Sequence, residues 1–369
     1  MTSAQVDVLL VAVVVAAACA IPGTFLVLRR MAMMSDAISH TVLLGIVLAF
    51  FVVADLNSPI LIIGAALVGL LTVGLVEAVS RTGLVRQDTA IGLVFPALFS
   101  IAVILISRLA GNVHLDSDAV LLGEIAFAPF NRFAPFGLDL GPVALWVMGT
   151  ILVVNLACTA LFFKELKLVT FDPALAAALG FSPALVHYGL MAVVSVTAVG
   201  AFDAVGSILV VALMVGPPAA AYLLTDRLPR MLGLSVVIGA VSAVGGYWLA
   251  RLLDTNIAGS MATVVGVVFT LILLFAPPRG LVASVRRRRR QRWTFASQML
   301  LIHLATHEGT AAEADESRPD HMHRHMRWPA EFADQVIQTA TERGLVRLDN
   351  EQLRLTAQGR EIARAAAVR

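Results

Sequence analysis

The chain has 369 residues, of which 59% are hydrophobic and only 14% are charged. Soluble globular domains are about 45–50% apolar and about 25% charged, so the excess apolar surface must face lipid. This composition excludes a water-soluble globule. Both cysteines, Cys19 and Cys158, lie inside apolar runs, so they predict neither a disulfide framework nor a CxxC metal site.

The net charge of +2 is unevenly distributed along the chain. Up to Pro278 there are 11 Lys and Arg against 14 Asp and Glu, and from Arg279 onward there are 16 against 11. A charged segment without a long apolar run is typical of a soluble domain attached to a membrane domain. We therefore predict a transmembrane domain over 1–280, a basic linker over 281–292 and a soluble domain over 293–369.

Apolar runs bounded by charged or Gly- and Pro-containing breaks fill the first domain. Each is close to the roughly 20 residues that cross about 30 Å of hydrocarbon, and helices satisfy the backbone there. The first run has no basic residue before it and leads into another membrane segment, so we expect it to remain as a helix. The runs are 6–29, 37–54, 59–79, 89–107, 140–163, 184–201, 206–224, 231–251 and 257–276. They predict an all-α polytopic membrane protein with about nine transmembrane helices.

Lysine and arginine are biased to alternate loops, which predicts the orientation because positive loops remain inside. With the N-terminus outside, only Arg108, Arg132 and Arg251 lie in outer loops. The inner segments hold Arg29, Arg30, Arg81, Arg86, Lys164, Lys167, Arg227, Arg230 and the arginine run 286–290. The C-terminal domain is therefore expected in the cytosol.

Phosphate-binding and hydrolytic motifs are missing from the sequence. A P-loop needs GxxxxGK[ST], but the only lysines are Lys164 and Lys167, and neither follows a glycine. The sequence also has no HExxH or GxSxG motif. We predict that the chain is not an enzyme and hydrolyses no ATP by the P-loop route.

The stretch from Gly23 to Ile46 carries the best candidate metal ligands. Asp36 and His40 are four residues apart, which places a carboxylate and an imidazole on one face of a helix. These donors suit Mn²⁺, Fe²⁺ or Zn²⁺. An Asp–His hydrogen bond that only fixes the helix explains the pair about equally well.

Accessory metal ligands are candidates in two polar segments. His114 and Asp116 lie in the outer loop, where a solvated acidic loop is the alternative. The C-terminal domain contains a His- and acid-rich tract, for which a disordered linker is the alternative. The tract comprises His321, His323 and His325, together with His303, His307, Glu308, Asp315 and Glu316.

Segment 164–182 lies between the fifth and sixth apolar runs and is too polar to span. Asp172 and Pro173 are a helix-start signal, and Gly180 is a stop. We expect a short helix on the cytosolic side.

The C-terminal domain is predicted to contain helices over 294–307 and 329–343 with a polar break over 308–327 between them. Gly344 is expected to end the second helix, and two strand-like pieces flank Asp349 and Asn350 before a last helix from Thr356. Helices followed by a two-strand ribbon predict a small α+β, winged-helix-like domain.

Over roughly residues 5–280 the sequence resembles the permease subunits of bacterial metal-cation ABC importers. The resemblance is carried by GTFLVLRRMAMMSDAISHTVLLGI, RQDTAIGLVF, LLGEI, FDPALAAALGF and VGSILVVALMVGPPAAAYLL. It implies an inner-membrane protein in which Asp172, Pro173, Ala176 and Gly180 belong to a coupling helix that docks into a separate ATPase subunit. Asp36 and His40 would contact the passing cation. The implied partners are this ATPase, an extracytoplasmic metal-binding protein and a second permease, in a homodimer or heterodimer.

The C-terminal domain departs from most of that family and resembles the winged-helix part of iron- and manganese-dependent repressors, which some of these permeases carry as a fusion. The polar stretch 308–327 disturbs the usual helix-turn-helix spacing. We therefore expect a regulatory or interaction domain and no nucleic-acid partner.

The sequence thus predicts an importer permease for a divalent metal, with Mn²⁺ favoured over Zn²⁺ and Fe²⁺. The ion is cargo, and no permanently bound cofactor is expected. A proton-driven secondary metal transporter and a membrane-tethered metal sensor with a DNA-binding tail remain the alternatives.

Overall fold

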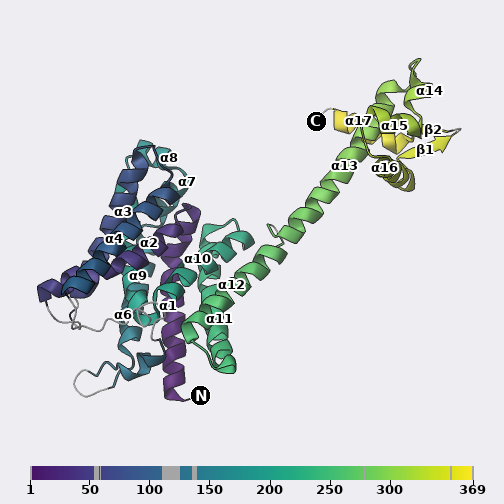
Figure 1. Cartoon of the computed structure of the whole chain (residues 1–369). Helices are drawn as coiled ribbons and strands as arrows, with labels where there is room; N and C mark the ends of the chain where they lie inside the picture. The colour runs from purple at the N-terminus through teal and green to yellow at the C-terminus, as the bar shows by residue number, and fades with distance from the viewer. Residues whose placement is uncertain are drawn as a thin grey trace. The chain divides into compact units, whose positions relative to one another are not determined.

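The computed structural model describes residues 2–53, 58, 60–109, 125–134, 139–277, 279–349 and 351–367. The chain divides into two compact units, Met1–Gly280 and Leu281–Arg369 (Figure 1).

Within the described part of the first unit, nine helices are long and apolar enough to cross a membrane. Each contains most of one predicted apolar run, so the expected nine spans are confirmed for this part of the chain. The helices are α1 (Ser3–Leu28), α2 (Met33–Val53), α3 (Ile60–Arg81), α4 (Gln87–Leu109), α6 (Val143–Leu161), α9 (Pro183–Val205), α10 (Ser207–Leu224), α11 (Leu228–Leu253) and α12 (Ile257–Phe275).

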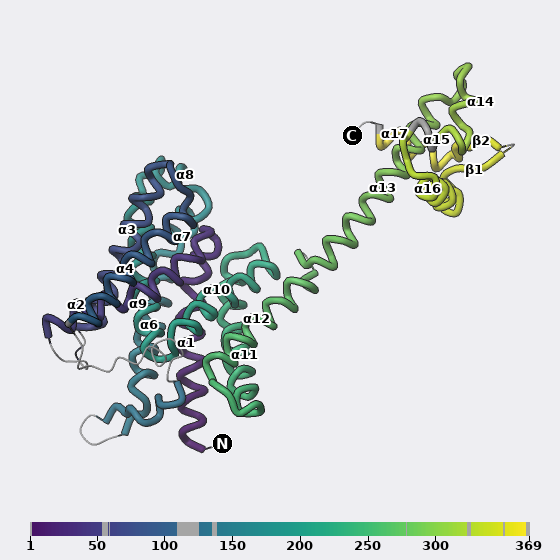
Figure 2. The backbone as a smooth tube through the Cα atoms, viewed as in Figure 1, coloured from purple at the N-terminus to yellow at the C-terminus, as the bar shows by residue number. Residues whose placement is uncertain are grey.

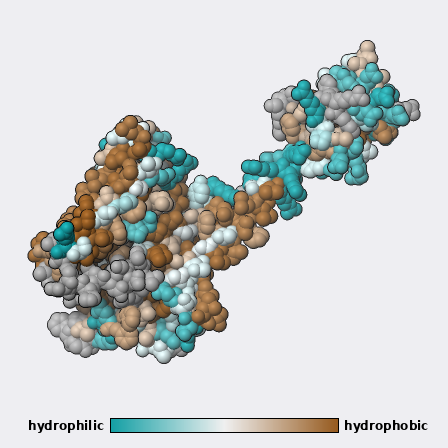
Figure 3. Space-filling view, viewed as in Figure 1, coloured by the Kyte–Doolittle hydropathy of each residue, from teal (hydrophilic) through white to brown (hydrophobic). Residues whose placement is uncertain are grey.

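Helix α1 lies at the centre of this bundle and packs against α6, α9, α10 and α11 (Figure 2). In α1, 78% of the most apolar 18-residue window is buried, compared with 17% in α6. The peripheral helices instead expose large apolar side chains, and Figure 3 shows this hydrophobic surface in brown. Such a surface fits lipid rather than water.

An asparagine of α6 replaces a backbone hydrogen bond that a proline inside α1 cannot make. Pro22 has no N–H to donate to the carbonyl of Ala18, four residues before it. The buried Asn155 side chain donates from Nδ2 to that carbonyl at 3.0 Å and lies 2.9 Å from Thr197 Oγ1 of α9. A neighbouring helix thus satisfies the backbone group that the proline leaves without its helical partner, as membrane interiors require.

Gly23, directly after this proline, allows α1 and α10 to meet backbone to backbone. A Cβ atom at position 23 would overlap the carbonyl oxygen of Met214 in α10. Small residues at such crossings let transmembrane helices approach closely.

Two short helices, α7 (Phe163–Phe171) and α8 (Pro173–Ala178), connect α6 to α9. They lie at the end of the bundle opposite to the N-terminus (Figure 1). Asp172 caps α8 by accepting a hydrogen bond from the Leu175 amide at 2.9 Å, and Gly180 has a left-handed φ of +86° just after its end. The start and stop expected from the sequence are therefore present.

On the predicted outer side, the short 3₁₀ helix η1 (Ile125–Phe130) is described. The preceding residues 110–124, with His114 and Asp116, lie outside the described residues.

The second unit contains five helices and a two-stranded antiparallel sheet in its described residues. They are α13 (Leu281–His307), α14 (Glu313–Glu316), α15 (Pro319–His325), α16 (Ala330–Glu342), β1 (Val346–Asp349), β2 (Gln352–Leu355) and α17 (Ala357–Ala367). Asp349 pairs with Gln352 at the turn, and Gly344 has a φ of +67° after α16.

Two segments differ from their predicted descriptions. The basic segment 281–292, expected as a linker, is the first part of the continuous helix α13, and the polar break 308–327 contains α14 and α15. Inward-facing apolar residues of α13 and α15 explain the second difference, because Leu300, Leu304 and Met322 join one core with Val336 and Leu353. The helices and ribbon agree with the expected outline, while a winged-helix fold stays a prediction.

Candidate functional site

Asp36 and His40 lie together near the start of α2, as their spacing predicts. His40 Nε2 is 3.4 Å from Asp36 Oδ1, and the two side chains are 29% and 33% exposed. The imidazole stacks on Phe95 of α4, with ring centroids 5.4 Å apart, and meets the edge of Phe99 at 6.1 Å. Helix α4 therefore orients the ring while the pair stays accessible.

The pair offers one carboxylate and one imidazole, which is fewer donors than a closed metal site requires. A structural zinc site uses four protein donors, and Mn²⁺ prefers a larger, oxygen-rich set. Among the residues that the structure describes, no group of three or more His, Cys, Asp or Glu ligands includes Asp36 or His40. For an ion to bind here, water or another chain would have to complete its coordination.

A polar network lies between the end of α1 and the short helix α7. Arg29, directly after α1, donates from Nε to Thr170 Oγ1 of α7 at 3.1 Å. Its Nη1 is 3.4 Å from His187 Nδ1 of α9, and His187 Nε2 is 3.9 Å from a carboxylate oxygen of Glu77 in α3. The network connects three spanning helices to the loop that carries α8. In the sequence, Arg29 indicates only the orientation of the first span, and no local pattern shows that it reaches residue 170.

The segment predicted to couple to an ATPase has one buried and one exposed side. Ala176 is fully buried, whereas Asp172, Pro173 and Gly180 are exposed. Four large apolar side chains also remain exposed around α8. They are Phe171, Leu175, Leu179 and Phe181. Clustered apolar side chains beside a capped polar loop are typical of a protein interface.

The accessory histidines of the second unit are only partly described. His321 is placed, but the side chains of His323 and His325 lie outside the described residues. His321 Nε2 is 2.8 Å from Glu316 Oε2. Glu316 in turn belongs to a group with His303 and His307, whose candidate ligand atoms all lie within 4.8 Å of one another.

In the described part of the chain, nine helices long and apolar enough to span, with an ionisable pair on one of them and a capped helix between spans, are typical of a polytopic membrane protein. The ABC 3 transport family matches residues 1–276, and the chain belongs to this family.

Two characterised relatives differ in how much of the chain they match. The zinc transport system membrane protein TroD of Treponema pallidum (strain Nichols) is 49% identical over 359 residues, which cover 97% of this chain and 98% of TroD. The manganese transport system membrane protein MntD of Bacillus subtilis (strain 168) is 50% identical over 275 residues, which cover 74% of this chain and 93% of MntD. TroD therefore matches most of the C-terminal unit as well as the bundle.

A solved structure supports the same architecture. PsaBC from Streptococcus pneumoniae, in complex with Fab, matches with a TM-score of 0.63 and 28% identity, covering 76% of this chain and 94% of that chain.

Proposed function

We propose that this chain is the multi-pass permease subunit of a bacterial inner-membrane ABC importer for divalent transition metals. The observation that carries the proposal is the family match over residues 1–276, which covers the nine candidate spanning helices of the described residues. Relatives at 49% and 50% identity are named as zinc and manganese transport proteins. In this reading the chain is not itself an enzyme, and a separate subunit hydrolyses ATP.

The metal that we propose first is Mn²⁺, with Zn²⁺ and Fe²⁺ as the other candidates. A carboxylate in an accessible position, where water can complete the shell, suits manganese, whereas imidazole-rich sites favour zinc. The Asp36–His40 pair has one donor of each kind and about 30% exposure, which supports weak, transient binding.

We further propose that the N-terminus faces outward and that α7, α8 and the C-terminal unit face the cytosol. The arginine and lysine bias of the loops supports this orientation. An extracytoplasmic metal-binding protein would then deliver the ion from outside. A second permease, identical or different, would supply further metal donors, because Asp36 and His40 provide only two.

We propose that α8 couples the permease to the ATPase by binding to it. The residues that form this coupling segment are Asp172, Pro173, Ala176 and Gly180. The exposed Leu175 and Leu179 supply the apolar contact, and buried Ala176 holds the helix against the bundle. The Arg29–Thr170 hydrogen bond would transmit movement of this segment to α1 and so to the start of α2. ATP binding on the partner thereby changes access to Asp36 and His40.

The first experiment measures metal uptake by the complete importer with Asp36→Asn. Because loss of a supporting group alone lowers metal affinity by about 10- to 100-fold, we expect uptake to fall by at least that factor. ATP hydrolysis and assembly should persist. Asp88→Asn is the matched control, since Asp88 is also an exposed carboxylate in the first turn of a spanning helix. Normal uptake by Asp36→Asn would remove the site assignment, and uptake by this chain alone without ATP would favour the proton-driven alternative.

A second experiment tests the coupling surface by co-purification with the ATPase subunit. Leu175→Glu should abolish association, because it places a charge in an apolar contact. Leu84→Glu should not, although Leu84 is 87% exposed in the loop between α3 and α4. Equal loss in both variants would show that α8 is not the specific contact.

The proposed transmission step has its own matched pair of variants. Arg29→Ala removes the bond to Thr170, whereas Arg30→Ala alters the adjacent, exposed arginine. Only the first should lower uptake per ATP hydrolysed in the assembled importer. An unchanged ratio in Arg29→Ala would exclude the Arg29–Thr170 link from coupling.

The C-terminal unit is proposed as a winged-helix-like regulatory or interaction domain without a nucleic-acid partner. The order of its helices and ribbon supports the winged-helix-like outline. MntD, named as a manganese transport protein, matches only 74% of this chain, which supports a role for this unit other than forming the pathway. Salt-sensitive DNA binding by the full chain would contradict the proposal.

A further inference from the structure

Two histidines lie on one face of the last turns of α13. His303 and His307 are four residues apart, so their side chains stand one above the other, with ring centroids 4.8 Å apart. His303 is 8% exposed, next to the buried Leu300 and Leu304 of the core. Two imidazoles at this spacing can bind one metal ion from a single helix.

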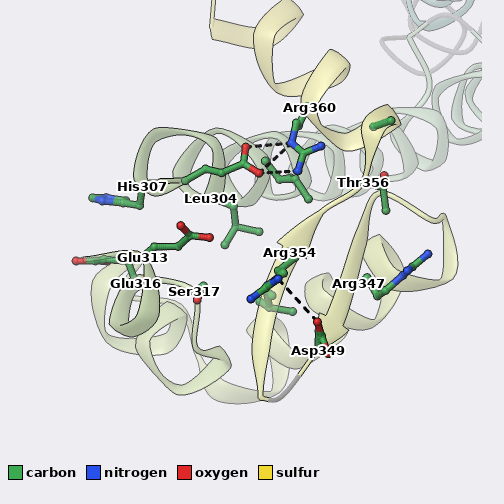
Figure 4. A pocket seen from close by; sticks show the side chains of 14 residues that line it. Leu304, His307, Glu313, Glu316, Ser317, Arg347, Asp349, Arg354, Thr356 and Arg360 are labelled. Carbon is green, nitrogen blue, oxygen red and sulfur yellow. Dashed lines mark hydrogen bonds and ion pairs between the residues drawn. The ribbon is translucent and has the colours of Figure 1, made fainter. Parts of the chain in front are cut away.

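A carboxylate and a third imidazole reach the same place from other helices. Glu316, at the end of α14, places Oε2 3.3 Å from His303 Nε2, and its backbone carbonyl lies 3.1 Å from the same nitrogen. His321, on α15, places Nε2 2.8 Å from Glu316 Oε2. Figure 4 shows His307 and Glu316 extending in the same direction at one edge of a cavity of about 420 Å³.

Burial and convergence together distinguish this group from an ordinary surface ion pair. The side chains of His303 and Glu316 are only 7% and 18% exposed, and that of His321 is 34% exposed. The ion pair between His321 and Glu316 accounts for one contact but not for the two further histidines, His303 and His307, beside Glu316. Three potential donors from α13 and α14 lie within 4.8 Å of one another, and His321 of α15 contacts one of them, Glu316. A cation there would offset the cost of burying the carboxylate.

We propose that His303, His307 and Glu316 form a Zn²⁺-binding site in the C-terminal unit, with His321, which contacts Glu316, as the fourth donor. Three imidazoles and one carboxylate match the four-donor set of a closed zinc site and are unsuited to Mg²⁺ or Ca²⁺. The donor set also differs from the single imidazole of the Asp36–His40 pair, which suits a transient ion. The site lies entirely within Leu281–Arg369 and stands whether or not the transport proposal does.

Zinc in this site would join α13, α14 and α15. The polar segment between residues 308 and 325 has two short helices, and among its described residues Met322 enters the core and the Ser317 carbonyl accepts a hydrogen bond from the Leu353 amide. An ion bound to both ends of this segment stabilises the folded unit, because it binds the folded state and not the separated helices. Metal availability would thereby control the order of this segment.

The test uses the purified full-length chain in detergent micelles with Asp36→Asn in the background, so that the membrane pair does not contribute. Zn²⁺ bound per chain is measured after gel filtration, and Co²⁺ serves as a spectroscopic probe of four-coordinate geometry. We expect one Zn²⁺ per chain, a tetrahedral Co²⁺ spectrum that Zn²⁺ abolishes, and a rise in the unfolding temperature with Zn²⁺. Failure of uptake in other experiments would not affect this result.

Two variants decide whether these residues hold the ion. His307→Ala and Glu316→Gln should each weaken Zn²⁺ binding by at least about tenfold. His307 is half-buried, so its truncation is less disruptive than that of buried His303. Glu313→Gln is the matched control, because Glu313 belongs to the same helix but accepts a hydrogen bond from the Gly309 amide at 2.7 Å.

Three outcomes would overturn the site. The first is Zn²⁺ binding by His307→Ala and Glu316→Gln with the affinity of the parent. The second is an equal loss of Zn²⁺ affinity in Glu313→Gln, which would show that removal of any nearby negative charge weakens binding. The third is loss on combined His323→Ala and His325→Ala with no loss in His307→Ala, which would place the ion on the HMHRH tract instead.

Discussion

The two units of the chain place their polar and apolar side chains in opposite ways. The membrane unit exposes large apolar residues, such as Leu67 at 61% and Leu252 at 81%, and keeps polar contacts such as Asn155–Thr197 inside. The C-terminal unit buries Leu300 and Leu301 and exposes most of its charged residues. An exposed apolar side chain is therefore compatible with the lipid-facing surface of the first unit, whereas the second unit is stabilised by burying such side chains.

The candidate metal ligands of the two units also differ, in their number and in their burial. Asp36 and His40 are two accessible donors beside aromatic rings, whereas His303, His307, Glu316 and His321 are four donors that are partly or fully withdrawn from water. An importer must release its ion, while a regulatory site must retain one. Ligand number and burial, more than ligand identity, separate these two tasks.

The largest predicted effect concerns the independence of the two candidate metal sites: a substitution in one site should leave the other unchanged. Asp36→Asn should lower uptake by at least about 10- to 100-fold while leaving Zn²⁺ bound to the C-terminal unit unchanged. Glu316→Gln should release that zinc and leave the affinity for transported metal unchanged. Uptake of radioactive Mn²⁺ and zinc content of the purified chain measure the two arms. If either variant changed both quantities, the two sites would not be independent.

Local features of both units could be predicted from the sequence, because they depend on neighbours in the chain. Apolar run length fixes the spanning helices, Asp172 and Pro173 start α8, and Gly344 ends α16. The helices in segment 308–327 could not be predicted in this way. The segment has few apolar residues, and the sequence alone does not show that Met322 packs into the core.

Contacts between distant segments could not be predicted in this way. Asn155 meets Ala18 across 137 residues and Arg29 meets Thr170 across 141. Nothing in a single sequence states which spanning helices lie side by side, because every span is apolar on several faces. The Asp36–His40 pair was accessible to prediction because one helical turn connects the two residues.

A second prediction concerns the close crossing of α1 and α10 in the membrane unit. Gly23→Ala should destabilise the unit by about 3 kcal/mol, because the new methyl group overlaps the backbone carbonyl of Met214, which cannot rotate away. Thermal unfolding in detergent measures the loss. Gly74→Ala in α3 is the control, since no atom lies within 4 Å of a Cβ there, and it should be neutral or slightly stabilising.

A third prediction concerns the contribution of one buried hydrogen bond, from Asn155 to the Ala18 carbonyl, to the stability of the membrane unit. Asn155→Leu leaves the Ala18 carbonyl without the donor that compensates for Pro22, which should cost about 1–3 kcal/mol. Pro22→Ala restores a backbone N–H for that carbonyl, so the double variant should lose less stability than the sum of the two single variants. Strict additivity would show that Asn155 contributes only through Thr197.

The smallest predicted effect belongs to the surface of the C-terminal unit, where a strong-looking ion pair should matter little. Arg360 donates hydrogen bonds to both carboxylate oxygens of Glu308 and holds the pKa of that carboxyl below its usual range. A depressed folded-state pKa stabilises the fold above the unfolded value of about 4.3, and this contribution is lost as the pH falls through the folded value. Both side chains are more than a third exposed, so water and salt screen the pair.

Glu308→Gln should therefore lower the unfolding temperature slightly near neutral pH, and the difference from the parent should shrink in high salt and below about pH 4. Glu331→Gln, an exposed acid in the first turn of α16, provides the control for loss of one negative charge. A Glu308→Gln effect as large as that of Asn155→Leu would break the comparison, because it would mean that an exposed ion pair stabilises this unit as much as a buried amide stabilises the bundle. A difference that persists undiminished at acidic pH would show that the carboxylate charge is not its source.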